Sequence, residues 1–390
     1  MSMPPTRHVL VLTSCLGGGH VFRDLAIGRE LERLLPPGHR IVFASGGAAY
    51  RMIAEEGVPV EEIAGMRFPA HLGTVDFLKV YFAVLTSELK QLFDLRRLLK
   101  KYRPELVVLD EYFFLADYCR WKGIPVVFMS DFVGVPREPF LRSPLRALLE
   151  RFFDWWLSGW LPRRVARWIY IGAPQLIPSA AWRERSQRRG LDFVEPISKL
   201  QYTPPPGRDE ARRRLGISPG TRVVTVSVGC SEVGGYLLDA ANQASEVLRG
   251  AFPDLTMELV CGMGIDSSEL ARKAKPGVRV HGYVRNLEEL LAASDAVVAQ
   301  CGLTTTTECL MIGVPTLLVP LANHWEQQNT ARYAAEVAGC ESLSADRVTA
   351  ATLAEKIGDL LQKGRRPTTA FRGDGHVRAA QLIAGALGAA

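Results

Sequence analysis

The sequence HGYVRNLEELLAASDAVVAQCGLTTTTECLMIGVPTLLVPLANHWEQQNTA, residues 281–331, decides the fold of this chain. Within it, the apolar run 297–299 favours a short β-strand, Gly302 breaks that strand, and the threonines 304–307 predict the start of a helix. A strand, a glycine turn and a helix start place free backbone N–H groups and the positive end of a helix dipole around one point. This order of features predicts a binding site for phosphate.

The residues that follow predict sugar and ribose contacts beside that phosphate site. Glu308 lies further along the same helix, where a carboxylate accepts hydrogen bonds from ribose hydroxyls. A second strand, 316–319, ends at Pro320, and the segment after it is rich in amides, acids and histidine. Such a cluster suits a sugar, which needs many donors and acceptors. An ordinary βαβαβ unit with a threonine cap and a solvated helix start is the alternative interpretation.

Taken together, the ordered motif resembles the donor site of GT-B nucleotide-sugar glycosyltransferases. The resemblance is strongest to the group that contains the lipid II UDP-N-acetylglucosamine transferases, the UDP-glucuronosyltransferases and the macrolide transferases. It implies a phosphate turn, a ribose contact, sugar contacts and a uracil platform. By this resemblance, Gly302, Thr304, Thr305 and Thr306 would form the phosphate turn, and Glu308 would contact the ribose. Asn323, Glu326 and Gln327 would contact the sugar, and Tyr283 with Val284 would form the uracil platform.

Composition sets the class of protein. The 390 residues suggest two domains of ordinary size, and 47% apolar with 23% charged residues is a globular balance. The net charge of +6 favours anionic substrates or an anionic membrane surface, but it is too dispersed to indicate nucleic acid. The seven cysteines show no metal-ligand spacing, so we expect reduced thiols in a cytoplasmic protein, with the inner face of the membrane as an alternative location.

Both halves of the chain alternate continuously apolar strands with helices. Strands at 8–13, 41–44, 106–109 and 125–129 predict a first parallel sheet, and strands at 223–228, 255–260, 278–282, 296–299 and 316–319 predict a second. The predicted fold is α/β, with two Rossmann-like doubly wound domains facing a cleft. We expect an acceptor-binding domain at 1–203, a donor-binding domain at 204–374 and a C-terminal helix at 375–390 that packs back on the first domain. The proline-rich segment 203–220 reads as the interdomain linker.

A glycine-rich turn after the first strand predicts the catalytic centre. Gly18 and Gly19 let the backbone approach the donor, and His20 follows them near a helix start, expected at 21–35. There the helix dipole disfavours imidazolium and keeps the ring available as a base. The lipid II transferases also end this turn in Gly-Gly-His, and related natural-product transferases place their base histidine here. The alternative role for His20 is a helix cap or a phosphate contact.

A base needs a partner that orients it, and several acids follow strands of the first half. By resemblance to plant-type transferases, Asp110 at the end of strand 106–109 is the expected partner of His20. Glu111 and Asp131 are held in reserve. The alternative for Asp110 is a simple turn residue at a strand end.

The loop after the first strand of the second half adds to the donor site. Ser227 and Gly229 resemble the glycine- and serine-rich loop that contacts the donor diphosphate in the family. Two departures from the family pattern stand out. Gln300 occupies a position where many relatives carry His or Arg, and the Gly-Pro-x-Arg pattern is replaced by residues 195–199, which end in Lys199.

Aromatic and arginine residues alternate through residues 140–170, an insertion in the first domain. Trp155, Trp156, Trp160 and Trp168 are interleaved with six arginines. On amphipathic helices this composition favours a membrane interface. Packing on the first domain, a dimer interface and a pocket for a flat apolar acceptor remain alternatives.

The sequence therefore predicts an inverting, metal-independent glycosyltransferase. The donor is a UDP-sugar or dTDP-sugar used as co-substrate without a further cofactor, and the acceptor is a hydroxyl on a hydrophobic or lipid-linked molecule. The alternatives are a UDP-sugar 2-epimerase of the same fold and a non-catalytic sugar-nucleotide-binding scaffold. The sequence lacks a DxD motif for a catalytic Mg²⁺ or Mn²⁺, in agreement with the metal-independent reading.

Overall fold

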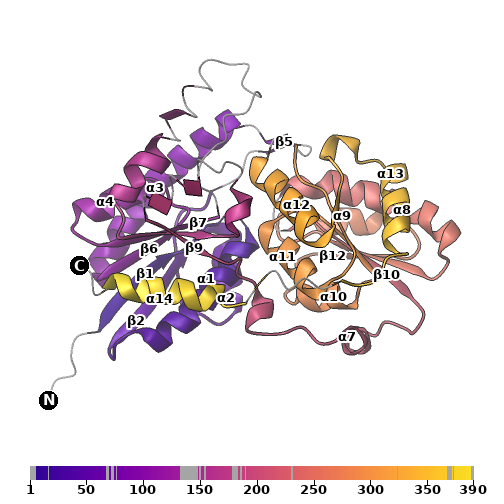
Figure 1. The fold of residues 1–390 in the computed structure, drawn as a ribbon, viewed down its shortest axis with the longest axis horizontal. Coiled ribbons are helices and arrows are strands. Elements are labelled where there is room, and N and C mark those ends of the chain that lie inside the picture. Colours follow the sequence, from indigo (N-terminus) through magenta and orange to yellow (C-terminus); the bar gives the residue numbers. More distant parts are fainter. Residues whose placement is uncertain are drawn as a thin grey trace. The chain divides into compact units, whose positions relative to one another are not determined.

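A computed structural model defines two compact units, each built on its own parallel sheet (Figure 1). The first unit contains 1–68, 77–197 and 372–390, and the second contains 69–76 and 198–371. The structure describes residues 6–15, 17–66, 70–71, 74–75, 77–131, 148, 151–152, 155–177, 183–184, 187–188, 190–229, 232–322, 324–366, 371 and 373–387.

The sheet of the first unit has seven strands in the order β3-β2-β1-β6-β7-β8-β9, and neighbouring strands run parallel. Its strands are β1 (Arg7–Leu12), β2 (His39–Ser45), β3 (Val60–Glu62), β6 (Leu106–Asp110), β7 (Val126–Ser130), β8 (Arg167–Ile171) and β9 (Leu191–Val194). The central strands β6 and β7 are buried along their whole length. Strands covered on both faces read as continuous apolar runs, which is why the sequence revealed them.

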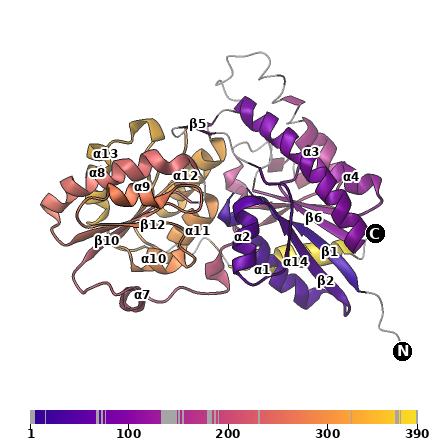
Figure 2. The same cartoon turned by 180° about the vertical axis from the view of Figure 1, so that it is seen from behind.

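Helices cover this sheet on both faces (Figures 1 and 2). They are α1 (Gly18–Leu34), α2 (Gly47–Glu55), α3 (Phe77–Tyr102), α4 (Leu115–Trp121) and α14 (Gly375–Leu387). The C-terminal helix α14 packs against α1, so the last described residues of the chain belong to the same unit as the first.

The sheet of the second unit has six strands in the order β12-β11-β10-β13-β14-β15, again parallel throughout. Its strands are β10 (Arg222–Ser227), β11 (Leu255–Val260), β12 (Val278–His281), β13 (Ala296–Ala299), β14 (Thr316–Leu318) and β15 (Glu341–Ser342). Its helices are α7 (Arg208–Arg214), α8 (Gly235–Ala251), α9 (Ser267–Arg272), α10 (Leu287–Ala293), α11 (Leu303–Ile312), α12 (Trp325–Ala338) and α13 (Ala350–Leu360). A short antiparallel hairpin, β4 (Ala70–His71) with β5 (Thr74–Val75), groups with this unit.

The strand order reverses direction once in each sheet. In the first unit the reversal lies between β1 and β6, and in the second it lies between β10 and β13. In doubly wound sheets, ligands bind outside the carboxyl ends of the strands at this reversal. The loops after β1, β6, β10 and β13 are therefore where each unit would bind a ligand.

The predicted doubly wound α/β fold is confirmed, with several local differences. Helix α1 starts at Gly18 rather than at 21, because the glycines after Gly17 already adopt helical geometry. Helix α3 begins at Phe77, shortly after β5 ends at Val75. The segment expected as a free linker holds α7, which packs on α10 and buries Arg212.

Part of the aromatic-basic segment does not form the interfacial helix that the sequence predicted. Trp168 lies in strand β8, not on a helix, and is only 2% exposed. Trp156 is buried against Phe113 and Phe114 from the α4 region. Aromatic packing on the first domain therefore holds for these two tryptophans.

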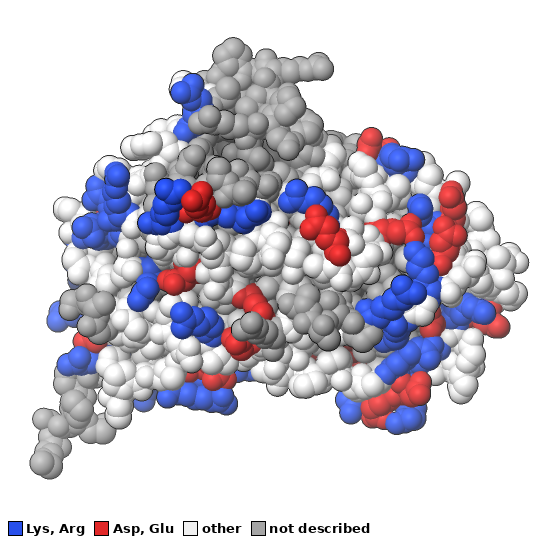
Figure 3. Space-filling model, in the orientation of Figure 1, with Lys and Arg blue, Asp and Glu red and all other residues white. Residues whose placement is uncertain are grey.

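Other members of the segment are exposed. Trp155 is 54% exposed and Phe152 is 52% exposed, whereas 140–147, 149–150 and 153–154 fall outside the described residues. Across the described ranges, no helix combines the length and apolar character needed to cross a membrane. On the face drawn in Figure 3, basic and acidic side chains are intermixed.

Candidate active site

His20 and Asp110 meet at the strand reversal of the first unit. Gly17 caps helix α1 with extended backbone, which places His20 in the first turn of the helix. Asp110 is the last residue of β6, and β6 pairs directly with β1, so the turn after β1 lies beside it. The ring Nδ1 of His20 is 2.8 Å from Asp110 Oδ2, and Asp110 is completely buried. The structure thus brings together the two residues that the sequence paired.

Arg23 completes this site, and the sequence analysis missed it. Its guanidinium donates to Asp131 Oδ2 at 2.8 Å and also donates to Asp110 Oδ1. The same NH2 group lies 2.8 Å from His20 Nδ1. Residues three apart share a helix face, so an arginine one turn after His20 was the available signal. Its partners come from distant strands, which only the fold brings close.

The charges in this cluster are arranged around the buried guanidinium. Burial alone would raise the pKa of Asp110, but the Arg23 charge and then His20 lower it below its usual value. The Arg23 charge likewise outweighs burial and lowers the pKa of Asp131. Both carboxylates are therefore ionised, and a charge pair of this kind is stable in a buried site because each partner compensates the other.

The ionised Asp110 determines which nitrogen of His20 carries the proton. Nδ1 has one hydrogen-bonding direction, and both Asp110 and Arg23 lie within reach of it. A carboxylate only accepts and Arg23 already donates to Asp110 Oδ1, so the favoured arrangement is Nδ1–H donating to Asp110. Nε2 is then unprotonated and available to accept a proton, as a general base requires.

Glu111 lies on the other side of the His20 ring. It adopts a left-handed backbone with φ of 60°, and its backbone N–H donates to the Met129 carbonyl at 3.1 Å. Its Oε2 is 3.8 Å from His20 Nε2. Burial first, and then the negative charge of Asp131, raise the pKa of Glu111 well above its usual value. Glu111 is therefore a neutral acid beside the base, whereas the sequence had held it in reserve as an orienting partner of His20.

Ligand atoms of His20, Glu111 and Asp131 lie within 4.8 Å of one another, the spacing of a possible metal site. The cation that Asp131 contacts is Arg23, at 2.8 Å. The Arg23 guanidinium therefore takes the electrostatic position that a metal ion would need.

The strand reversal of the second unit carries hydroxyl and backbone N–H groups instead of a charged cluster. The loops after β10 and β13 are joined by a hydrogen bond from Gln300 N–H to the Ser227 carbonyl at 3.1 Å. Gly229 has φ of 70°, a conformation that glycine adopts without strain. The Ser227 hydroxyl is buried, and within the described residues it has no hydrogen-bond partner. A buried hydroxyl of this kind is ready for a ligand oxygen.

Helix α11 begins at this point. Gly302 is its N-cap, and the first intrahelical bond of the cap runs from Thr306 N–H to the Gly302 carbonyl at 3.0 Å. The N–H groups of Leu303, Thr304 and Thr305 precede that bond, so they have no acceptor within the helix. The predicted phosphate turn thus presents three N–H groups at the positive end of a helix dipole.

Glu308 lies further along α11 and is buried, with 7% of its surface exposed. Ser198 donates its hydroxyl to Glu308 Oε1 at 3.0 Å. Burial first, and then the charge of Glu288, raise the pKa of Glu308 to about 8. Lys199, the cation of the divergent segment, pairs with Glu288 at 2.8 Å. The contact between Ser198 and Glu308 was not foreseen from the sequence.

The remaining predicted donor residues are placed as follows. Tyr283 and Val284 follow β12, two strands from β10, and both are half-buried. Glu326 is half-buried in the first turn of α12. The Gln327 carboxamide oxygen accepts from Leu321 N–H at 2.8 Å, which ties the loop to the helix.

Three predicted donor residues need separate mention. Asn323 falls outside the described residues. Gly18 and Gly19 form the first turn of α1 in the first unit, so within their own unit they belong with His20.

Comparison with known proteins agrees with this fold. The glycosyltransferase from kitacinnamycin biosynthesis has a similar fold, with a TM-score of 0.64 and 20% identity over 99% of this chain and 98% of that one. Two Rossmann-like units of this kind define the GT-B architecture, and the chain is a nucleotide-sugar glycosyltransferase of that architecture.

The sequence relatives specify the group more closely. Residues 223–383 match the glycosyltransferase family 28 C-terminal domain. An uncharacterized glycosyltransferase of Methanopyrus kandleri is 25% identical over 93% of this chain and 100% of its own length. A UDP-N-acetylglucosamine–N-acetylmuramyl-(pentapeptide) pyrophosphoryl-undecaprenol N-acetylglucosamine transferase of Desulfitobacterium hafniense is 22% identical over 96% of this chain and 97% of the relative.

Proposed function

We propose that this glycosyltransferase transfers a sugar from a UDP-sugar or dTDP-sugar to a hydroxyl of a hydrophobic or lipid-linked acceptor, with inversion and without a metal. The observation that carries the proposal is the contact of His20 with the ionised Asp110 at a strand reversal. This arrangement leaves Nε2 of the ring as a base near a helix start, where a substrate hydroxyl is expected.

The proposed reaction is a single displacement. The acceptor oxygen attacks the anomeric carbon while His20 Nε2 takes the hydroxyl proton. The bond between that carbon and the diphosphate oxygen breaks, and the diphosphate leaves with the electron pair. Asp110 holds the ring in the required tautomer and stabilises the imidazolium that forms. Arg23 keeps Asp110 ionised, so it acts as a positioning residue through Asp110.

The leaving diphosphate gains its stabilisation from the second unit in this proposal. The N–H groups of 303–305 and the Ser227 hydroxyl supply donors that need no reorganisation during the reaction. Fixed donors aimed at developing charge are the form of stabilisation that accelerates a reaction most. This arrangement compensates for Gln300, which supplies no positive charge at the phosphate turn.

Two observations support an apolar acceptor. The printed name of the Desulfitobacterium hafniense relative includes an undecaprenol-linked substrate. In this chain, the side chains of Leu148, Phe152 and Trp155 are exposed in the aromatic-basic segment. Exposed aromatics beside arginines favour the headgroup region of a bilayer, so we propose that the enzyme works at the cytoplasmic membrane surface.

The test is a turnover assay with a panel of UDP- and dTDP-sugars, in which release of the nucleoside diphosphate is measured with and without detergent-solubilised prenyl-linked acceptors. We expect transfer or slow hydrolysis with one donor. His20→Ala should lower kcat by about 10² to 10⁴ and leave nucleotide affinity unchanged, because loss of a general base acts on the transition state. Isomerisation of the sugar, or turnover by His20→Ala within a few-fold of the unaltered enzyme, would contradict the proposal.

A further inference from the structure

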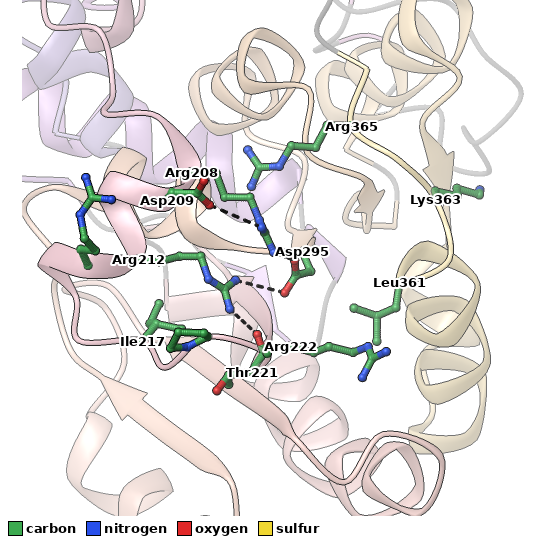
Figure 4. Close-up of a pocket in the computed structure, with 13 residues that line it drawn as sticks. Arg208, Asp209, Arg212, Ile217, Thr221, Arg222, Asp295, Leu361, Lys363 and Arg365 are labelled. Carbon is green, nitrogen blue, oxygen red and sulfur yellow. Dashed lines mark hydrogen bonds and ion pairs between the residues drawn. The ribbon is translucent and has the colours of Figure 1, made fainter.

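The second unit contains a cavity of about 920 Å³ that is separate from the candidate donor site. It lies where α7, the start of β10 and the segment after α13 meet (Figure 4). Arg222 lines it at the amino end of β10, whereas Ser227 of the donor site is the last residue of that strand. Five residues of extended strand separate the two by about 17 Å, so one ligand phosphate cannot serve both places.

The lining of this cavity is strongly cationic. It includes six basic side chains and two carboxylates, those of Asp209 and Asp295. The basic residues are Arg208, Arg212, Arg213, Arg222, Lys363 and Arg365. Arg213 is paired with Glu210, and the remaining excess of positive charge around a concave site attracts anions and focuses the field within it.

Asp295 does not neutralise the arginines that surround it. Arg208 pairs with one of its oxygens, and Arg212 NH1 lies 3.4 Å from the other. Figure 4 shows the Arg212 guanidinium directed at Asp295 and the Arg208 guanidinium lying between Asp209 and Asp295. Arg212 is also fixed by the backbone, because it donates to the Ala293 carbonyl at 3.0 Å and to the Thr221 carbonyl. Arg212 is therefore a buried, fixed part of the lining, whereas Arg208, Arg213, Arg222 and Lys363 are exposed around it.

Arg365 gives independent evidence of excess positive charge. Within the described chain it forms no ion pair and donates instead to the Ala292 and Ser294 carbonyls, at 2.6 and 2.5 Å. Burial first, and then repulsion from Arg208, lower the pKa of Arg365, and attraction to Asp295 offsets this only in part. A half-buried arginine held among other arginines is stabilised when an anion joins them.

Arg222 and Lys363 add further cations to the lining. Arg222 lies over the Phe252 ring at 5.2 Å and has no carboxylate partner within the part of the chain that the structure describes. Lys363 pairs with Glu341, which Lys356 also contacts. Glu341 can therefore stay paired with Lys356 while Lys363 contacts a ligand.

We propose that this cavity binds a small anion that carries several phosphate groups. Guanidinium groups match phosphate oxygens in pairs, and several of them around one cavity select a polyphosphate over a single carboxylate. The occupant would connect α7, the amino edge of the sheet and the segment after α13. It should therefore stabilise the second unit without occupying the donor site.

The test is isothermal titration of the full-length protein with inorganic tripolyphosphate, in the presence of saturating UDP so that the donor site is filled. We expect one further binding event whose affinity falls as salt rises, because the contacts are ionic. The double variant Arg222→Gln with Lys363→Gln should lower that affinity at least about tenfold, the effect of losing charged hydrogen bonds. Both side chains are on the outer part of the lining, so the fold should be retained, which thermal unfolding checks.

A matched control removes the same charge from elsewhere in the second unit. The control double variant is Arg272→Gln with Arg347→Gln, two exposed arginines outside the cavity lining. It should bind tripolyphosphate within about twofold of the unaltered protein, since exposed charges beyond a Debye length are screened. The proposal would be overturned if both double variants bound tripolyphosphate with equal affinity, or if the UDP-saturated protein bound no tripolyphosphate.

A second arm identifies the source of the phosphate. Flotation with vesicles that contain phosphatidic acid, compared with neutral vesicles, tests a lipid headgroup as the occupant. If tripolyphosphate binds and the cavity variant floats like the control, the occupant is a soluble polyphosphate. If only vesicle binding is lost in the cavity variant, the phosphate belongs to a lipid. Vesicle binding that is equal in both variants, together with no tripolyphosphate binding, would rule out the site.

Discussion

The two strand reversals share one topology but carry opposite chemistry. The reversal between β1 and β6 is filled with titratable side chains, in which His20, Asp110, Arg23 and Asp131 form one connected cluster. The reversal between β10 and β13 presents backbone N–H groups, hydroxyls and one buried acid, Glu308. A doubly wound sheet supplies the position of a site, and the residues after the strands decide what that site does.

The difference indicates a division of labour. A group that moves a proton needs a fixed orientation and tautomer, which His20 gains from Asp110, itself paired with Arg23. A group that receives a diphosphate should keep its charge fixed, and peptide dipoles do so without titrating. We therefore expect changes in the first cluster to alter turnover and changes in the second to alter nucleotide affinity.

The largest effect should come from Asp110→Asn. The amide leaves the volume almost unchanged but removes the anion that holds Nδ1–H of His20. The ring can then adopt the other tautomer, with the proton on Nε2, and the base is lost. Turnover should fall by about 10² to 10⁴, as expected for loss of general-base catalysis, while UDP affinity stays within a few-fold. Steady-state kinetics and titration calorimetry measure the two quantities, and a large loss of UDP affinity would break the division.

Arg23→Met should lower stability as well as activity. The substitution keeps a long side chain but leaves Asp110 and Asp131 buried without their cation. Removing one partner of a buried ion pair costs about 3 to 5 kcal/mol. Chemical denaturation measures this loss, and Arg23→Lys should recover part of it.

The same cluster predicts that the free energy of unfolding decreases at low pH. Because the pKa values of Asp110 and Asp131 are lowered in the folded protein, their stabilising contribution is present above the unfolded pKa of aspartate. That contribution should be lost as pH falls through the folded values. In Arg23→Met the acid-dependent part of the stability should shrink, and an unchanged pH profile would show that Arg23 does not stabilise these carboxylates.

Glu308 should set nucleotide affinity. Glu308→Ala should weaken UDP binding by about 1.5 to 3 kcal/mol, the range for a charged hydrogen bond, and it should leave the fold intact. dTDP lacks the ribose 2′-hydroxyl, so the substitution should also reduce any preference for UDP over dTDP. Titrations with both nucleotides measure this, and an unchanged UDP affinity would remove Glu308 from the site.

The pKa of Glu308, raised to about 8, gives this contact a pH dependence. Glu308 is protonated at pH 6, whereas the ribose hydroxyls are best bound by a carboxylate. UDP affinity should therefore rise as pH passes through about 8 and level off only above that value. Glu308→Gln should bind UDP with a flat profile over this range, which provides the matched control.

The smallest expected effect is that of a chelator. Because Arg23 takes the cationic position beside Asp131, turnover should stay within about twofold when EDTA is added. Full loss of turnover with EDTA, restored by a divalent cation, would assign a metal to His20, Glu111 and Asp131.

Most of the fold was predictable from the sequence, because buried parallel strands are continuously apolar. Strand β11 was predicted at 255–260 and β13 at 296–299, and both are found there. Strand β8 was missed because Trp168 and Tyr170 belong to an aromatic-rich segment whose composition also fits a surface helix. Composition alone does not distinguish an aromatic residue in a core from one at a membrane.

The candidate sites were predictable in part. His20 and Asp110 could be paired through the resemblance to plant-type transferases, and both lie at strand ends, which meet at one edge of a parallel sheet. Arg23 could not be placed, since its partners Asp110 and Asp131 are 87 and 108 residues away in the chain. Likewise, the cationic cavity combines residues from α7, β10 and the segment after α13, and no local pattern joins them.

The most direct test of the division of labour is a crossed measurement on two variants, His20→Ala and Glu308→Ala. Single-turnover rate with saturating donor and the dissociation constant for UDP are determined for both. The account predicts that His20→Ala slows turnover by about 10² to 10⁴ with unchanged UDP affinity. It also predicts that Glu308→Ala weakens UDP binding by about 1.5 to 3 kcal/mol and changes the saturated rate much less. Equal effects of both variants on rate and on affinity would contradict the account.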